Sequence, residues 1–197
     1  MQMLPAGRDG VLVQVADAAE AVALARFARA AQVQAVEVVP GAETVLFDGV
    51  GDRSALEGLL ARWSPEAAET VGPLVELSTS YDGADLDAVA DLWGTDVAGV
   101  VARHSGIEFV SAFCGFAPGF AYLSGLPEHL AVPRRDTPRT RVPAGSVALA
   151  GAWCGVYPGV SPGGWQLLGT TDAGLWDETR DEPALLAPGT RVRFVPR

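Results

Sequence analysis

The sequence predicts a mixed α+β protein with two domains, a ferredoxin-like domain over residues 1–80 and an all-β barrel or sandwich over residues 81–197. In the first third, strand and helix patterns follow the order β-α-β-β-α-β, the split-βαβ order of ferredoxin-like domains. Further on, Pro-Gly pairs recur between short apolar runs, which is typical of short strands joined by tight turns. The chain has 197 residues, 49% of them hydrophobic, which suits two small cores and argues against disorder.

The first elements follow from alternating polarity, helix propensity and capping. Val11 to Val15 alternates as a strand does. The alanine-rich stretch from about Ala18 to Ala31 predicts a helix, with Asp17 as its N-cap. Ala35 to Val39 and Thr44 to Phe47 flank a Pro-Gly turn and are expected to pair as a hairpin.

A second helix and a fourth strand complete the expected N-terminal domain. Ser54 is the expected N-cap of a helix from Ala55 to Trp63, and Val71 to Leu77 is the expected last strand. A domain boundary is expected near Ser78–Tyr81. The predicted domain is a four-stranded antiparallel sheet with both helices on one face.

The second domain is expected to start with short helices at Ala84 to Leu92 and Thr95 to His104, the latter capped by Thr95, and then a strand from Ile107 to Phe113. Pro-Gly pairs predict type II turns, because proline fixes φ and glycine accepts a positive φ. These pairs are Pro118-Gly119, Pro158-Gly159, Pro162-Gly163 and Pro188-Gly189. The apolar runs between them are Val147 to Ala150, Trp165 to Leu168 and Val192 to Val195.

Composition excludes several classes of function. A net charge of −10 argues against binding to duplex nucleic acid, and no apolar run approaches the roughly 18 residues of a membrane span. The chain has no lysine, which excludes a GxxxxGK[ST] phosphate loop and Schiff-base chemistry. The N-terminus lacks the pattern of a signal peptide, and Cys114 and Cys154 are expected to be buried thiols of a cytoplasmic protein.

Four arginines lie within eight residues of this acidic chain: Arg134, Arg135, Arg139 and Arg141. Prolines in the surrounding segment, Pro133 to Ser146, restrict the backbone, so the guanidinium groups are expected to be held in place. Such a cluster favours a small anionic ligand, a carboxylate or a phosphate. The alternative is a surface strip that pairs with nearby Asp or Glu residues.

Glycines and aromatic residues alternate in two segments that are candidates for a pocket wall. In Gly115 to Tyr122 (GFAPGFAY), glycines permit close approach of the backbone to a ligand and aromatic faces line the pocket. The candidate residues of this segment are Gly115, Phe116, Pro118, Gly119, Phe120 and Tyr122. The alternative is a packed barrel corner. In Ser161 to Trp165 (SPGGW), a glycine turn delivers Trp165 as a lid, an interface anchor or a core residue.

Few side chains are candidates for catalysis. Ser146 follows Gly145 in a VPAGS turn, but no Gly-x-Ser-x-Gly elbow surrounds it, so hydrogen bonding is its expected role. His104 ends a predicted helix; a structural role is favoured, with a general base as the alternative. No further ligands accompany the histidines, so no metal site is expected. Asp82 and Asp85 are interpreted as helix-start residues.

Together these segments resemble a known family. GFAPGFAYLSGLPEHLAVPRRDTPRTRVPAGSVALAG, followed by GVYPGVSPGGWQLLG, closely resembles the C-terminal half of the B subunit of bacterial 5-oxoprolinase. The family has also been called allophanate hydrolase subunit 1, and it includes an inhibitor of a sporulation histidine kinase. The similarity extends upstream to Tyr81-Asp82-Gly83, Asp85-Leu86 and His104, and it covers about residues 70 to 195.

The resemblance implies a cyclophilin-like β-barrel for the C-terminal domain and a larger, similarly folded partner, the C subunit of the same enzyme. It implies that the complex uses ATP, with Mg²⁺, to open the ring of 5-oxo-L-proline to L-glutamate. Arg134, Arg135 and Arg139 would then bind the substrate's carboxylate or a phosphate. Backbone N–H groups of the Gly115–Gly119 and Gly145 turns would stabilise an oxyanion, and His104 or Tyr122 would move a proton.

The sequence departs from the family pattern in two places. Gly169-Thr170-Thr171-Asp172 replaces the usual Gly-Arg-Thr-Pro, and Gly151-Ala152-Trp153-Cys154 replaces Gly-Gly-Gln-Thr. Two alternatives to the oxoprolinase remain open: a carboxyltransferase subunit of the allophanate hydrolase or urea carboxylase type, and a non-catalytic inhibitor of a histidine kinase. A carboxyltransferase would need biotin from another chain, because this one has no lysine to carry it.

Overall fold

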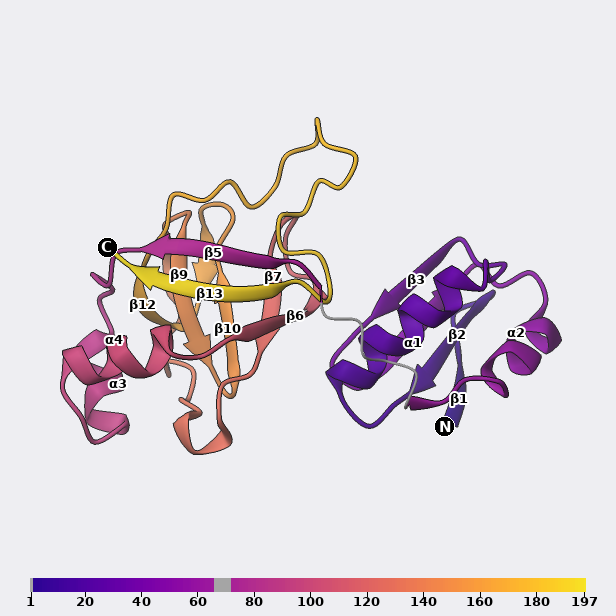
Figure 1. Ribbon diagram of the computed structural model, residues 1–197, viewed down its shortest axis with the longest axis horizontal. Coiled ribbons are helices and arrows are strands. Elements are labelled where there is room, and N and C mark those ends of the chain that lie inside the picture. The colour runs from indigo at the N-terminus through magenta and orange to yellow at the C-terminus, as the bar shows by residue number, and fades with distance from the viewer. Residues whose placement is uncertain (1, 66–71) are drawn as a thin grey trace. The chain divides into compact units, whose positions relative to one another are not determined.

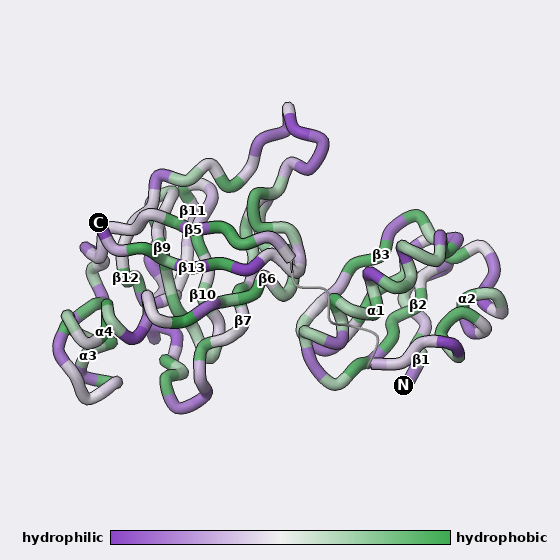
Figure 2. Tube along the Cα trace, viewed as in Figure 1, coloured by the Kyte–Doolittle hydropathy of each residue, from purple (hydrophilic) through white to green (hydrophobic). Residues whose placement is uncertain are grey.

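A computed structural model describes residues 2–65 and 72–197, and the chain divides into two compact units, Met1–Val71 and Gly72–Arg197 (Figure 1). Within the described residues, no helix is both long enough and apolar enough to cross a membrane. Hydrophobic residues concentrate along the strands, whereas the loop between the last two strands of the chain is hydrophilic at its tip (Figure 2).

The first unit is an antiparallel sheet with two helices. Its elements are β1 (Gln2–Ala6), β2 (Gly10–Gln14), α1 (Ala18–Ala30), β3 (Glu37–Pro40), β4 (Thr44–Asp48) and α2 (Arg53–Leu60). The strand order is β1-β2-β4-β3, and each neighbouring pair is antiparallel. The expected Pro-Gly hairpin is the β3–β4 pair. Val13 and Phe47 from the sheet and Leu24 from α1 are buried in one core cluster.

Helix capping agrees with the sequence at α1 and differs at α2. The Asp17 carboxylate accepts a hydrogen bond from the Glu20 N–H, as expected of an N-cap. In α2 the cap is Asp52, which accepts from the Ala55 N–H, and Ser54 is already inside the helix. Both residues have oxygen acceptors, and the helix starts at the earlier one.

The expected ferredoxin-like order is not found in the first unit, whose elements run β-β-α-β-β-α. That order required the strand expected at Val71 to Leu77; its start lies outside the described residues, and the rest is β5 (Leu74–Thr79). β5 belongs to the second unit, where it pairs in parallel with the last strand of the chain. In the first sheet, the free edge of β2 is occupied by β1 instead, which the sequence analysis did not identify.

The second unit is a nearly closed β-barrel. Its remaining elements are α3 (Leu86–Leu92), α4 (Val97–Ser105), β6 (Phe109–Cys114), β7 (Ala121–Ser124), η2 (Glu128–Leu130), β8 (Arg139–Val142), β9 (Ser146–Ala150), β10 (Trp153–Val156), β11 (Ser161–Gly163), β12 (Gln166–Thr170) and β13 (Arg191–Pro196). The main sheet has the order β12-β9-β10-β7-β6-β13-β5, and β8 pairs with β11 separately. A bridge between Ser80 and Thr170 joins the two edges of the main sheet.

Two helices and two core clusters complete the barrel unit. The N-cap of α4 is Asp96, whose carboxylate accepts a hydrogen bond from the Gly99 N–H. The sequence had predicted Thr95, one residue earlier, as the cap, and that prediction was wrong. Strand β9 is buried on both faces: Val147 and Leu149 pack in the main core, while Ala148 and Ala150 pack in a second cluster. This second cluster contains most of the aromatic residues that form the pocket described next.

Candidate functional site

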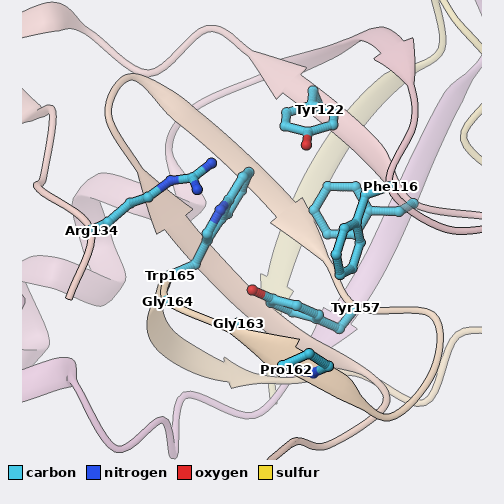
Figure 3. Close-up of a pocket in the computed structure, with 9 residues that line it drawn as sticks. Phe116, Tyr122, Arg134, Tyr157, Pro162, Gly163, Gly164 and Trp165 are labelled. Carbon is cyan, nitrogen blue, oxygen red and sulfur yellow. The ribbon is translucent and has the colours of Figure 1, made fainter. Parts of the chain in front are cut away.

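A small pocket lies beside the second core cluster, and aromatic rings, one cation and a glycine turn form its walls (Figure 3). Its cavity volume is about 150 Å³. The lining residues are Phe116, Phe120, Tyr122, Arg134, Tyr157, Pro162, Gly163, Gly164 and Trp165. They come from the turn before β7, from β7 itself, from the segment before β8, and from β11 with the residues on both sides of it.

Phe120 is the centre of the aromatic wall. It is buried, and its ring makes edge-to-face contacts with Tyr122, Tyr157 and Trp165 at centroid distances of 5.1, 5.5 and 5.5 Å. Such packing contributes beyond the area it buries and restricts the rotamers of each ring. The pocket is therefore built on a rigid aromatic cluster rather than on loose side chains.

Phe116 is the exposed ring of the pocket. Its φ of +70° is in the left-handed region, which non-glycine residues rarely adopt, and the residue is 60% exposed. The ring packs edge-on against Phe120 at 5.3 Å. An unfavourable backbone conformation at a pocket residue is a recognised mark of a functional site.

Gly163 is required by the close approach of Tyr157. A Cβ at Gly163 would lie 2.3 Å from the Tyr157 hydroxyl oxygen, so no larger residue fits without moving the phenol. Burial raises the pKa of Tyr157, and a hydrogen bond from the Trp165 backbone N–H opposes that shift only in part. The hydroxyl therefore stays protonated at neutral pH and can donate a hydrogen bond.

Asp85 divides the arginine cluster into paired and unpaired groups. Its carboxylate accepts hydrogen bonds from Arg135 and Arg139, both at 2.8 Å, and is only 3% exposed. Burial alone would raise the pKa of Asp85, but hydrogen bonds from Arg139 and the Leu167 N–H and the charges of both arginines hold it below its usual value. Both guanidinium groups are therefore ion-paired to one buried carboxylate, which offsets one of their two positive charges.

Arg134 and Arg141 have no ion pair or hydrogen bond among the described residues. Arg141 is exposed and does not line the pocket. The Arg134 guanidinium extends beside the Trp165 ring toward the aromatic wall (Figure 3). The pocket thus combines apolar faces with one uncompensated cation, an arrangement suited to a small molecule with one anionic group.

Comparison with known proteins places this architecture in a family. Residues 1–186 match the family model of the carboxyltransferase domain, subdomain C and D. A 5-oxoprolinase B subunit of Escherichia coli O157:H7 is 46% identical over 170 residues, which is 82% of this chain and 78% of that protein. The chain belongs to the family of 5-oxoprolinase B subunits.

Solved structures resemble this family member over nearly its whole length. The protein TTHA0988 is 34% identical with a TM-score of 0.82 over 95% of this chain, which spans only 39% of the length of TTHA0988. The K. lactis urea amidolyase has a TM-score of 0.73 over 99% of this chain and 15% of its own, at 22% identity. At that identity the urea amidolyase shows the shared fold alone.

The structure of this 5-oxoprolinase B-subunit family member brings together five of the residues that the sequence singled out: Phe116, Phe120, Tyr122, Arg134 and Trp165. Gly115, Pro118 and Gly119 do not line the pocket; they shape the turn that carries Phe116 and Phe120. At Gly119, with φ of +83°, a Cβ would lie 2.9 Å from the Trp176 Cβ.

Arg135 and Arg139 both form ion pairs with Asp85. For these two residues the alternative interpretation of the arginine cluster, pairing with a nearby acidic residue, is therefore the correct one. Gly145 and Ser146 lie away from the pocket lining. The Gly145 N–H donates to the Tyr157 carbonyl, and the Ser146 hydroxyl, 2% exposed, donates to the Pro143 carbonyl at 2.8 Å. Ser146 therefore has the hydrogen-bonding role expected for it.

His104 lies in the main core and not in the pocket. It is fully buried, with Nδ1 at 2.7 Å from the Tyr81 hydroxyl oxygen and Nε2 at 3.5 Å from the Cys154 sulfur. Its ring also packs on Phe109 and Phe194. Burial lowers its pKa to about 3, so the ring is neutral and structural in this setting.

Two important residues were missed by the sequence analysis. Tyr157, which lines the pocket beside Gly163, was not selected, although it directly precedes a Pro-Gly pair, much as Trp165 follows one. Asp85 does start a helix, as expected, since it occupies the N-cap position of α3; its side chain makes no capping hydrogen bond, and its ion pairs with the arginine cluster were missed. No local signal identifies its partners, because they lie 50 and 54 residues away along the chain.

Proposed function

We propose that this chain is the B subunit of a heteromeric, ATP-dependent 5-oxoprolinase, which opens the ring of 5-oxo-L-proline to give L-glutamate. The observation that carries the proposal is the aromatic cavity with one unpaired arginine, on a chain 46% identical to a 5-oxoprolinase B subunit. In the same proposal, the barrel is of the cyclophilin-like type, and the complex acts in the cytoplasm, which suits the two free cysteines.

The pocket fits a single small ring with one carboxylate. A cavity of about 150 Å³, lined by Phe116, Tyr157 and Trp165, has room for such a ring. The Arg134 guanidinium, which also lines it, would form a bidentate bond to the carboxylate. The Tyr157 hydroxyl is a protonated donor that can bind the lactam oxygen. Tyr122 would supply the proton that the ring nitrogen gains when the lactam C–N bond is hydrolysed.

ATP does not fit the same cavity. Ligand pockets for larger molecules usually measure about 300–1,000 Å³. This chain also has no lysine to hold phosphates or to carry biotin. We therefore assign ATP and its Mg²⁺ to another part of the complex, and we propose a larger homologous C subunit as the partner. On this basis the chain is expected to be inactive alone.

The test is co-expression with the candidate C subunit, followed by measurement of ATP-dependent glutamate release from 5-oxo-L-proline. Arg134→Ala should raise KM about 30-fold, because a charge-assisted hydrogen bond contributes about 2 kcal/mol. Arg141→Ala is the matched control, since Arg141 is an unpaired arginine of the same cluster outside the pocket, and its KM should equal that of the wild type.

Three outcomes would contradict the proposal. A wild-type KM for Arg134→Ala would show that this guanidinium does not bind the carboxylate. A complex that consumes urea or allophanate, and releases no glutamate from 5-oxo-L-proline, would replace the substrate and support the carboxyltransferase alternative. Depression of the autophosphorylation of a histidine kinase by the chain alone would support the regulatory alternative.

A further inference from the structure

Asp85 connects three elements that are distant in sequence. It precedes α3, and its buried carboxylate accepts hydrogen bonds from Arg135 Nη1 at 2.8 Å, Arg139 Nη2 at 2.8 Å and the Leu167 N–H at 2.7 Å. The Asp85 N–H in turn donates to the Leu167 carbonyl at 3.1 Å. One residue therefore joins the arginine segment to the start of β12.

The same junction is tied by two further hydrogen bonds that flank Arg134. On one side, the Gln166 amide donates to the Pro133 carbonyl at 3.0 Å. On the other side, the Arg135 N–H donates to the Gly164 carbonyl at 2.8 Å. Both residues next to Arg134 are thus held to the segment that carries Gly164 and Trp165, two residues of the pocket wall.

Arg134 itself has no such support. Its side chain has no ion pair among the described residues, so its position in the pocket depends on the backbone of its neighbours. The two guanidiniums bound to Asp85 would repel each other and Arg134 if the carboxylate lost its charge, and a buried charge without a partner is strongly unfavourable. Loss of the Asp85 charge would therefore remove a restraint on the segment that carries Arg134.

We propose that Asp85 is a positioning residue of the pocket: by binding Arg135, Arg139 and the Leu167 N–H, it holds the segment 133–139 against β12 and keeps the Arg134 guanidinium beside Trp165. Asp85 does not line the pocket, so it acts through Arg134 and not on the ligand. The identity of the ligand rests on the proposed function, whereas the positioning itself can be measured without any activity.

The first experiment is hydrogen exchange, followed by mass spectrometry, on the full chain with Asp85→Asn. Amides in the segments 133–139 and 164–167 should exchange about tenfold faster, because the free energy needed to separate these two segments falls. Amides of β4, in the other unit, should exchange at the same rate as in the wild type. Glu108→Gln is the matched control: Glu108 also binds two arginines, Arg191 and Arg193, but it is partly exposed and does not line the pocket. Unchanged exchange of both segments in Asp85→Asn would overturn the proposal.

The second experiment is a double-mutant cycle on the co-expressed complex. Asp85→Asn should raise KM for 5-oxo-L-proline about tenfold in the wild-type background. In the Arg134→Ala background the same change should raise KM less than about twofold, because the group that it positions is gone. Equal increases in both backgrounds would show that Asp85 does not act through Arg134.

If Asp85→Asn fails to fold, Asp85→Asn/Arg135→Gln removes one cation together with the anion and lowers the charge left unpaired. This variant should fold, with faster exchange of the segment 133–139 and a raised KM; wild-type exchange and KM would overturn the proposal. A wild-type complex without activity on 5-oxo-L-proline would refute the proposed function, and the exchange experiment would still decide the role of Asp85.

Discussion

The buried His104 should make the barrel unit lose stability in mild acid. The ring is enclosed by Tyr81, Cys154, Phe109 and Phe194 and has no exposed surface. Burial lowers its pKa from 6.5 to about 3. The perturbation to test is His104→Gln, which removes the titrating group and keeps an amide able to bond the Tyr81 hydroxyl.

The magnitude follows from proton linkage. Below pH 6.5 the unfolded chain binds a proton on His104, and the folded chain does not until about pH 3. The contribution of His104 to stability is therefore fully present above pH 6.5. Between pH 6.5 and about pH 3, the ratio of folded to unfolded protein falls roughly tenfold per pH unit. Between pH 7 and pH 5 this amounts to about 2 kcal/mol of unfolding free energy.

The assay is urea denaturation at pH 7, 6 and 5, followed by tryptophan fluorescence. Trp63 lies in the first unit and the other tryptophans in the second, so the signal reports mainly on the barrel. His104→Gln should be less stable than the wild type at pH 7 and should lose most of the pH dependence. His129→Gln, which changes the exposed histidine, is the control and should keep the slope of the wild type.

A wild-type slope in His104→Gln would refute this reasoning. It would mean that the loss of stability between pH 7 and pH 5 does not come from His104, and Asp85 could not replace it, because its lowered pKa places its contribution at lower pH. A flat slope in the wild type would show that the histidine is hydrated or protonated in the folded protein. Either result would also reopen a chemical role for His104.

Two further predictions concern the pocket and the buried thiols. Gly163→Ala should raise KM for 5-oxo-L-proline roughly tenfold in the co-expressed complex, because the new Cβ would lie 2.3 Å from the Tyr157 hydroxyl oxygen and force the phenol to move. A wild-type KM would show that the cavity tolerates this shift. Cys154 should resist a thiol reagent in the native chain, because it is fully buried and burial raises its pKa, whereas the partly exposed Cys114 should react first; mass spectrometry of the labelled peptides would reveal the opposite order.

Different residues of the pocket contribute to the stability of the barrel and to contact with a ligand. The inner rings are buried, with Phe120 and Tyr157 each 2% exposed, and they belong to the core of the barrel. Phe116 and Arg134 are exposed at the opening, and neither contributes to that core. A substitution at the opening should therefore change binding with little effect on stability, whereas one at the inner rings should change both.

Several parts of the fold could be predicted from the sequence, because they depend on local chemistry. The strands β9, β12 and β13 coincide closely with the apolar runs expected there. Positive φ occurs at Gly119 and Gly189, as type II Pro-Gly turns require, but not at Gly159 or at Gly163, which lies inside β11, so the type II prediction was wrong for those two pairs. Periodicity and turn chemistry act over a few residues, so they leave a direct trace in the sequence.

The pairing of strands could not be predicted in the same way. The strand expected to close the N-terminal sheet overlaps β5, but it pairs with β13, more than a hundred residues away. Alternation of apolar residues indicates that a strand exists and does not indicate which edge it joins. The ferredoxin-like expectation was wrong for that reason.

By itself, the sequence determined the family, the turn-rich barrel half, the aromatic character of the pocket and the presence of four clustered arginines. Only the tertiary structure decided which of those arginines is available to a ligand. Asp85 engages two of them in ion pairs from a position 50 and 54 residues away, and Arg141 lies outside the pocket, which leaves Arg134. The physical reason is that an arginine can bind a ligand only if no acidic side chain nearby already binds it. Which side chains are nearby depends on the folding of the barrel, which brings residues distant in sequence together.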